Sequence, residues 1–323
     1  MQRKAGTSRR NLLRVCLGGA LALDAAPPEK SKVAIARDPR IRPAGGAADS
    51  TRLLKVLDRA MQSLYGLDSP AECWRQVARP GEVVGLKVNC LSGKGASTST
   101  VLVEAICERL AEAGIAQTDI VIWDRLNSDL ESGGFRVASR KDKIRCIGND
   151  EAGYYPELSV YGSVGSLVSN TLVKTCHAII NLPVLKDHGI VGVTLALKNL
   201  FGAIHNPNKY HIDAGDPYVA DAFMLPPIRQ KVRLTICDAI TAQYEGGPSY
   251  MPQWSWAFNG VMASRDPVAL DYTGWQIIEK KRAEKGMRPL REVKREPAYI
   301  ARAADAQHKL GTNDPRLIEV LEA

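Results

Sequence analysis

The sequence predicts an α/β fold, in which helices cover both faces of a mostly parallel sheet and the chain forms two lobes. Strand-like apolar runs alternate with segments of helical periodicity along most of the chain, a pattern typical of parallel β/α units. Several of these runs end in a lysine, asparagine or aspartate, as expected where ligands gather beyond the carboxyl ends of strands. A hydrophobic fraction of 45% and a charged fraction of 24% are those of a globular protein, which excludes disordered, collagen-like and coiled-coil classes.

The individual elements follow from apolar spacing and capping residues. In residues 51–66 apolar side chains recur every three or four positions up to the closing glycine, which predicts a helix. Asp266 is the expected N-cap of a long helix that has Pro267 at its first position and Asp271 in a structural role near its start. The expected strands are 32–37, 82–90, 119–124, 177–185 and 232–240, and the expected helices are 51–66, 97–114, 194–203 and 266–286. Residues 125–160 and 242–260 are expected to be irregular.

The N-terminal residues 1–26 have the order of a twin-arginine export signal. Ser8, Arg9 and Arg10 precede an apolar run, which is followed by small residues and a proline pair. This order predicts a cleaved signal and export to the periplasm by the twin-arginine translocase; the alternative is an amphipathic N-terminal helix. Residues 30–323 are expected to form a single α/β domain, with two lobes divided near residue 160. No later run is long enough for a transmembrane helix, so none is expected in the mature chain.

Charge and cysteine spacing narrow the classes of partner. The formal net charge is +8, but five basic residues against one aspartate in residues 1–26 supply half of it. The rest is dispersed and no nucleic-acid motif accompanies it, so nucleic-acid binding is not expected. None of the six cysteines after residue 26 lies in a CxxC pair, so no iron–sulfur cluster is expected. Disulfide pairing stays open, because sequence alone cannot pair these cysteines.

The stretch "LPVLKDHGIVGVTLALKNLFGAIHNPNKYH", residues 182–211, concentrates the candidate chemistry. It holds three of the chain's five histidines and Lys198, which is set among leucines in "TLALKNLFG". The apolar neighbours predict that Lys198 is buried, and a buried lysine needs a carboxylate or bound anion, or else its pKa falls. A lowered pKa makes a lysine a base or a nucleophile. The alternative is that Lys198 extends to the surface.

The glycines in this stretch predict an anion site. Gly189 and Gly192 allow close backbone approach, and Thr194 is the expected cap of the following helix. Free N–H groups at such a helix N-terminus suit an anion. His188, His205 and His211 are candidate metal ligands, acid/base groups or loop hydrogen-bonding residues, and their spacing does not single out zinc.

Polar residues at strand ends complete the candidate site. Lys87 and Asn89 follow one expected strand, Asp124 ends the next, and the Lys186–His188 turn ends a third. Parallel strands place these ends at one edge of the sheet. The remaining candidates are Asp238 at another strand end, Asn199 beside the central lysine, and Glu245, an expected partner for Lys198 in a glycine-rich turn.

Five stretches of the chain resemble the DUF362 family, a domain of unknown function. They are "GLKVNC", "NLPVLKDHGIVGVTLALKNLFGAI", "ICDAITAQYEGGP", "RDPVALDYTGWQII" and "LGTNDPRLIEV". The resemblance covers nearly all of the chain after the export signal. Some members of the family carry a ferredoxin-like cluster segment. This chain lacks those cysteines, so the resemblance implies no iron–sulfur cluster here.

The central stretch is also similar to the N-terminal domain of nickel-dependent lactate racemase. There a histidine, a lysine ten residues later and a further histidine serve a nickel-pincer cofactor and proton abstraction. His188, Lys198 and His211 fall in the same order here. The glycine turn differs in sequence, the last histidine falls at a different spacing and no matching second domain is found. The similarity therefore implies where the site lies more than which reaction it performs.

Two functions are compatible with these residues. The first is a small-molecule enzyme that binds an anionic substrate or a metal-containing cofactor and performs proton-transfer, racemase-like or redox chemistry. His188, Lys198 and His211 would be catalytic, and Lys87, Asn89, Asp124, Gly189, Gly192, Thr194, Asn199, Asp238 and Glu245 would bind the ligand. The second is a non-catalytic exported protein that binds or delivers a metal or small ligand.

Overall fold

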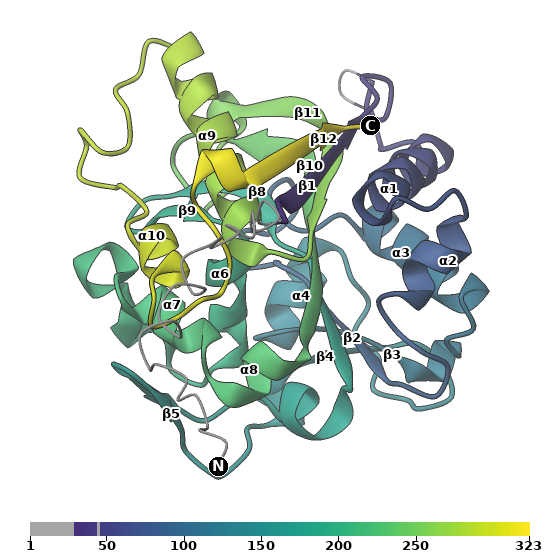
Figure 1. Cartoon of the computed structure of the whole chain (residues 1–323). Coiled ribbons are helices and arrows are strands. Elements are labelled where there is room, and N and C mark those ends of the chain that lie inside the picture. The colour runs from purple at the N-terminus through teal and green to yellow at the C-terminus, as the bar shows by residue number, and fades with distance from the viewer. Residues whose placement is uncertain (1–28, 44–45) are drawn as a thin grey trace, which may run out of the picture.

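A mostly parallel sheet forms the centre of the computed structural model, which describes residues 29–43 and 46–323 (Figure 1). The predicted export signal in residues 1–26 lies outside the described residues. Within the described part of the chain, ten strands form this sheet: β1 (Ser31–Arg37), β2 (Val84–Lys87), β3 (Ile120–Asp124), β4 (Arg145–Gly148), β7 (Ala178–Asn181), β8 (Val184–His188), β9 (Gly192–Thr194), β10 (Val232–Gln243), β11 (Ser255–Ser264) and β12 (Ile318–Glu322). Strands β5 (Ser159–Tyr161) and β6 (Val164–Ser166) form a separate antiparallel hairpin.

The strand order is β12-β1-β11-β10-β7-β2-β3-β4, and β8 pairs with β10 beyond the end of β7. Strands β10, β7, β2, β3 and β4 run parallel to one another, whereas β11 is antiparallel to both of its neighbours. The predicted fold class is therefore confirmed. Strands on either side of residue 160 share this sheet, because β7 pairs with both β2 and β10.

Helices cover both faces of the sheet (Figure 1). Helices α1, α2 and α3 lie on one face, and α6, α7, α9 and α10 lie on the other. The helices are α1 (Ser50–Tyr65), α2 (Pro70–Arg75), α3 (Thr100–Glu112), α4 (Asn127–Gly133), α5 (Asn149–Ala152), α6 (Ala196–Asn199), α7 (Tyr218–Phe223), α8 (Pro226–Lys231), α9 (Pro267–Glu284) and α10 (Tyr299–Ala304). As predicted, the Asp266 carboxylate caps α9 by accepting from the N–H groups of Val268 and Ala269.

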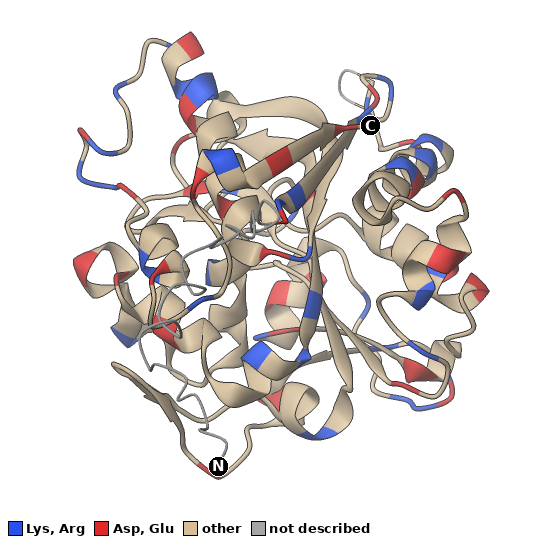
Figure 2. Ribbon diagram, viewed as in Figure 1, with Lys and Arg blue, Asp and Glu red and all other residues tan. Residues whose placement is uncertain are grey.

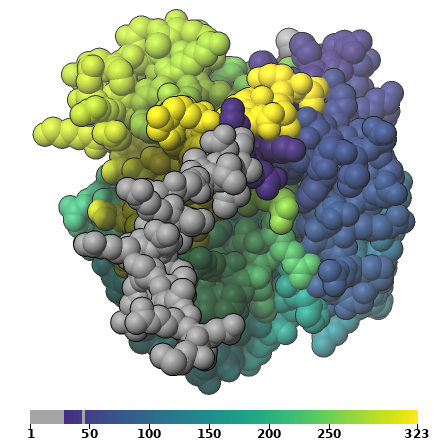
Figure 3. All heavy atoms as spheres, viewed as in Figure 1, coloured from purple at the N-terminus to yellow at the C-terminus, as the bar shows by residue number. Residues whose placement is uncertain are grey.

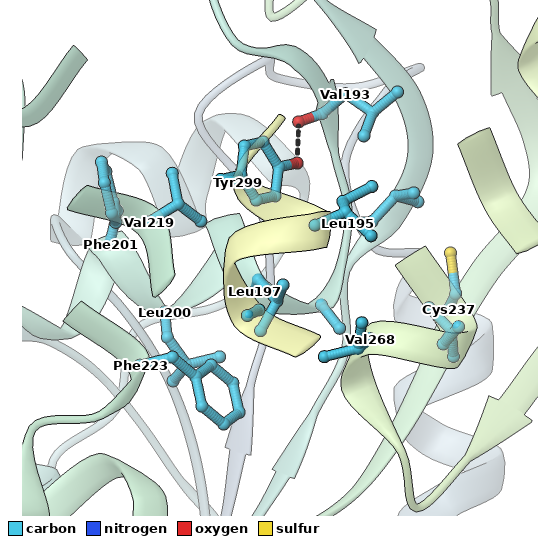
Figure 4. Close-up of a cluster of buried hydrophobic side chains, with 14 of the residues drawn as sticks. Val193, Leu195, Leu197, Leu200, Phe201, Val219, Phe223, Cys237, Val268 and Tyr299 are labelled. Carbon is cyan, nitrogen blue, oxygen red and sulfur yellow. Dashed lines mark hydrogen bonds between the residues drawn. The ribbon is translucent and has the colours of Figure 1, made fainter. Parts of the chain in front are cut away.

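Two hydrophobic cores result from the alternation of side chains along the strands. In β1, Val33 and Ile35 belong to the core under α9, whereas Ala34 and Ala36 belong to the core under α1. Figure 4 shows part of the first of these cores, where Leu195, Leu197 and Val268 lie among other apolar side chains; Leu195 also lies against Gly274 of α9. The Tyr299 hydroxyl donates to the carbonyl oxygen of Val193 at 3.0 Å, and this hydrogen bond connects α10 to residues 182–211.

Several elements differ from their predicted bounds. The expected strand 177–185 is two strands, β7 and β8, because Pro183 between them has no N–H for the ladder. The expected helix 194–203 is α6 followed by a 3-10 turn, Leu200–Ala203. The stretches expected to be irregular contain β4 and β11, whose pairing depends on neighbours far along the chain.

Figure 2 shows that Lys, Arg, Asp and Glu residues are scattered along the ribbon, which fits the dispersed charge expected from the sequence. In Figure 3 the yellow C-terminal atoms lie beside purple N-terminal ones, in agreement with the pairing of β12 and β1. The six cysteines of the described chain are free and buried. Within residues 29–43 and 46–323, the structure contains no helix that is both long and apolar enough to span a membrane.

Candidate functional site

A cavity of about 370 Å³ lies at the carboxyl ends of three strands. Lys87 is the last residue of β2, Asp124 is the last of β3 and His188 is the last of β8, and all three line the cavity. Asn89, Thr194, Lys198, Asn199 and His211 join them, so eight of the predicted site residues come together. A volume of about 370 Å³ is typical of a pocket that binds a small molecule.

The floor of the cavity contains a buried ion pair. Lys87 Nζ donates to Asp124 Oδ1 at 2.8 Å, and the other carboxylate oxygen accepts from the Cys90 N–H at 2.8 Å. Lys87 is 1% exposed. Gly202 lies against this pair, because a Cβ added there would be 2.7 Å from Lys87 Cε. The pair is thus held by the backbone and neutralises its own charge.

An amide network connects this floor to α6. Asn199 Oδ1 accepts from Asn89 Nδ2 at 2.9 Å, while Asn199 Nδ2 donates to Asn181 Oδ1 at 2.8 Å. Lys186, for which the sequence predicts a strand-end position but no particular role, donates to Asn89 Oδ1 at 2.7 Å and to two oxygens of the loop after Asn89, on Ser92 and Ala96. Burial lowers the pKa of Lys186 to about 8. Lys186 is a second basic side chain that lines the cavity.

Lys198 is a third cation in the cavity and it has no carboxylate partner among the described residues. Its side chain is 8% exposed, and its Nζ lies 4.1 Å from the centroid of the Phe201 ring. Burial, with a further contribution from the positive charges of Lys186 and Lys87, lowers the pKa of Lys198 to about 7. The prediction that Lys198 is buried is confirmed by its position.

The prediction that Glu245 pairs with Lys198 is wrong. The Glu245 carboxylate accepts from Arg295 at 2.6 Å and also from Arg282, and it does not line the cavity. Two arginines form ion pairs with this carboxylate, so it is not a counter-ion for Lys198. Among the residues that the structure describes, no carboxylate therefore pairs with the buried Lys198 ammonium group.

The rings of His188 and His211 stack in the cavity, with their centroids 5.5 Å apart. His188 Nδ1 accepts from the N–H groups of Ile190 at 3.1 Å and Val191 at 3.3 Å, so its proton lies on Nε2. His211 Nδ1 lies 3.2 Å from the carbonyl oxygens of Pro207 and Asn208, which only accept, so its proton lies on Nδ1. Burial lowers the pKa of His188 to about 2 and also lowers the pKa of His211. The pair therefore presents one donor, at His188 Nε2, and one acceptor, at His211 Nε2.

The predicted anion site at a helix N-terminus is occupied by the protein itself. The N–H groups of Ala196 and Leu197 donate to the two oxygens of Asp271 at 2.6 and 3.1 Å. Gly189 lies in the turn that joins β8 to β9, and it donates its N–H to the carbonyl oxygen of Gly247. Gly192 has a φ of 87° and packs against the Arg295 carbonyl oxygen. Neither glycine lines the cavity, so the structure does not bring these two predicted residues together with the others.

Thr194 lines the cavity but does not cap α6, whose N-cap is Leu195. Its Oγ1 is buried and has no hydrogen-bond partner among the described residues. A buried hydroxyl without a partner costs free energy, about 1–3 kcal/mol. The Thr194 hydroxyl is therefore an unpartnered polar group on a residue that lines the cavity.

Two further predicted residues lie outside the cavity. Asp238 is buried and accepts from the N–H groups of Ser99 at 2.7 Å and Ile240 at 3.0 Å. His205 is exposed and lies edge-on against Tyr154, with the ring centroids 4.9 Å apart. The expected metal set of His188, His205 and His211 therefore does not come together. Among the residues that the structure describes, no group of three or more His, Cys, Asp or Glu is arranged to hold a metal ion.

Other lining residues were missed by sequence reasoning. Phe201 and Gly202 follow the predicted lysine in an apolar helix, where nothing marks them as functional. Arg125 and Asp129 lie just beyond the end of β3, and that position at a strand end was the available signal. The cavity is therefore lined by more basic than acidic side chains, which gives it a positive charge. The four basic residues are Lys87, Arg125, Lys186 and Lys198, and the two acidic ones are Asp124 and Asp129.

Comparisons with known proteins place the chain in a family. The family model described as a domain of unknown function, DUF362, matches residues 84–276. A thylakoid-associated protein of Synechocystis sp. is 26% identical over 263 residues, which are 78% of this chain and 75% of that protein. A crystal structure of a Thermotoga maritima protein is similar with a TM-score of 0.44 at 9% identity, over 74% of this chain and 60% of that one. Because the family model matches more than half of its length, this chain belongs to the DUF362 family.

Proposed function

We propose that this protein is an exported enzyme that binds a small organic anion in the cavity and transfers a proton to and from it. The observation that carries the proposal is the position of Lys198, a buried amine beside two stacked histidines that has no carboxylate partner within residues 29–43 and 46–323. A buried cation without a counter-charge is destabilising, so its retention in a cavity fits a site where a ligand supplies the charge.

Hydrogen-bond donors around the cavity support anion binding. Lys198 Nζ, His188 Nε2–H and the Thr194 hydroxyl have no acceptor in the described chain, and each belongs to a lining residue. Lys186 and Arg125 add positive charge. A carboxylate accepts several such bonds at once, and charge-assisted bonds are stronger than neutral ones. The donor set therefore favours an anion over a metal ion held by protein side chains.

Two groups in the cavity have the properties of a base. A pKa of about 7 gives Lys198 both its protonated and its neutral form near neutral pH, the condition that favours general acid–base catalysis. His211 presents an unprotonated Nε2, and both groups contact the Phe201 ring, with the His211 ring centroid 5.6 Å from that of Phe201. His188 stays neutral and acts as a donor.

The reaction supported best is removal and return of a proton at a carbon next to a carboxylate or carbonyl group. The C–H bond breaks, its proton moves to Lys198 or His211, and its electron pair is delocalised onto the substrate oxygen. The His188 N–H and the cationic floor stabilise that oxygen. Return of a proton to either face of the carbon completes an isomerisation or racemisation and needs no other reactant.

Deuterium exchange tests this proposal directly. The full chain is incubated in D2O with 2-hydroxy, 2-oxo and 2-amino carboxylates, and loss of the α-proton signal is followed by ¹H NMR. We expect exchange with at least one class, abolished in Lys198→Met and unchanged in the exposed control Lys285→Met. Binding of carboxylates without exchange would instead support the alternative of a non-catalytic binding protein. Absence of carboxylate binding, measured by calorimetry, would overturn both.

Export is a separate part of the proposal and rests on the sequence of residues 1–26. Replacing the pair with lysines, Arg9→Lys with Arg10→Lys, should keep the protein in the cytoplasm of a host with a twin-arginine system. Cell fractionation measures this. Periplasmic accumulation of the double variant would contradict a twin-arginine signal.

A further inference from the structure

Exposed apolar side chains gather at the mouth of the cavity. Leu91 is 59% exposed and Ile190 is 52% exposed, and both line the cavity. Ile212, which is 59% exposed, directly follows the lining residue His211. Two of the six large apolar side chains that are exposed in the described chain therefore line this cavity, and a third directly follows a lining residue in the chain. Single exposed apolar side chains are ordinary on a protein surface, so it is their grouping beside one cavity that points to an interaction site.

The charged groups lie deeper than this apolar rim. Lys87 and Lys186 are each 1% exposed and Lys198 is 8% exposed, whereas the rim residues are more than half exposed. Phe201, Pro207 and Pro248 also contribute apolar surface to the cavity. The cavity thus changes from cationic at its floor to apolar at its mouth.

We propose that the substrate is an amphipathic organic acid, with its carboxylate bound at the cationic floor and its hydrocarbon part lying against Leu91 and Ile190. This inference rests on the function proposed above and adds the class of substrate. A cavity of about 370 Å³ has the size of sites for ligands well above two or three carbons.

The charge at the floor also decides between a small molecule and a protein partner. A protein that covered only the mouth would bury the apolar rim, but it would leave the Lys198 ammonium without an anion in an enclosed site. A molecule that reaches from the rim to the floor covers the apolar rim and also places an anion beside the Lys198 ammonium group. The rim residues are then determinants of chain-length specificity.

A homologous series of straight-chain acids, from acetate to octanoate, tests the inference by calorimetry on the full chain. Burial of hydrocarbon contributes roughly 0.8 kcal/mol per methylene, so we expect affinity to rise by up to about fourfold with each added carbon. In the double variant Leu91→Ser with Ile190→Ser this rise should flatten, while the affinity for acetate should stay unchanged.

Val160→Ser is the matched control, because Val160 is 59% exposed and belongs to the β5–β6 hairpin instead of the cavity. It should leave the whole series unchanged. Equal affinity for acetate and octanoate in the unmodified protein would overturn the amphipathic substrate and leave the anion site intact. If affinity rises with chain length as steeply in the Leu91→Ser with Ile190→Ser variant as in the unmodified protein, the amphipathic substrate is also overturned and the anion site is left intact. Failure of every acid to bind would overturn the proposed function as well.

Discussion

His188 and His211 stack with their ring planes 28° apart, yet their Nδ1 atoms face backbone groups of opposite character. Two N–H groups donate to Nδ1 of His188, and two carbonyl oxygens lie at Nδ1 of His211. The fold thereby assigns the two rings opposite tautomers. One presents a hydrogen-bond donor to the cavity and the other presents an acceptor.

The tautomers can be measured by long-range ¹H–¹⁵N NMR on the full chain. We expect His188 to carry its proton on Nε2 and to stay neutral through mildly acidic pH, because burial lowers its pKa to about 2. His211 should carry its proton on Nδ1 when neutral. A His188→Ala variant assigns the signals. An imidazolium at position 188 near pH 5 would contradict this assignment.

Replacing Lys198 with methionine should stabilise the folded protein at neutral pH. The folded pKa of about 7 lies below the ordinary value of 10.5, so between these values the unfolded chain holds a proton that the folded chain has released. Wild-type stability therefore rises with pH across this window. The advantage of the variant should be largest at and below pH 7 and should shrink by up to about 1.4 kcal/mol per pH unit toward pH 10.

Urea denaturation at several pH values measures that difference in the free energy of unfolding. The control is Lys285→Met, at an exposed position, which should show no such trend. A stability difference between wild type and Lys198→Met that does not change with pH would mean that Lys198 keeps an ordinary pKa.

Asp271 should be important for the position of Lys198, because its carboxylate accepts from the first two N–H groups of α6. Asp271→Ala leaves two buried donors without partners and should lower the free energy of unfolding by roughly 2 kcal/mol or more. Asp271→Asn keeps one acceptor oxygen and should cost less. Denaturation of both variants measures this, and an alanine variant as stable as wild type would contradict it.

Gly202→Ala should disturb the floor of the cavity. The added Cβ would lie 2.9 Å from Lys87 Nζ and 3.0 Å from Asp124 Oδ1, so the ammonium group must move away. We expect a loss of about 1–3 kcal/mol in stability and weaker carboxylate binding. The control is Gly165→Ala, where the added atom meets its neighbours at 3.7 Å or more and should change little. Equal carboxylate binding by the two variants would show that the floor does not contact the ligand.

Local patterns in the sequence were sufficient for the fold class, for the first parallel strands and for part of the site. Lys87, Asp124 and His188 each end a strand, and strands β2 and β3 are parallel neighbours, so their ends meet at one edge. The burial of Lys198 also followed from its apolar neighbours in the chain. These predictions depend only on periodicity and on the geometry of parallel sheets.

Long-range pairing of charged groups could not be predicted in the same way. Glu245 pairs with Arg282 and Arg295, which follow it by 37 and 50 residues, and no local pattern favours these over Lys198. Asp271 occupies the helix N-terminus of a segment 75 residues earlier in the chain, where an external anion was expected. A proton's position on His188 depends on a turn whose backbone geometry the sequence does not specify.

The central claim is that Lys198 is a buried amine that meets a bound carboxylate, and its own titration tests this most directly. Lysines labelled at the ε-carbon report their pKa by ¹³C NMR, and Lys198→Met identifies the signal. We expect Lys198 to have a pKa of about 7 in the free protein and a higher pKa with a saturating organic acid, because the carboxylate favours the charged amine. A pKa near 10.5 that the acid does not change would contradict it.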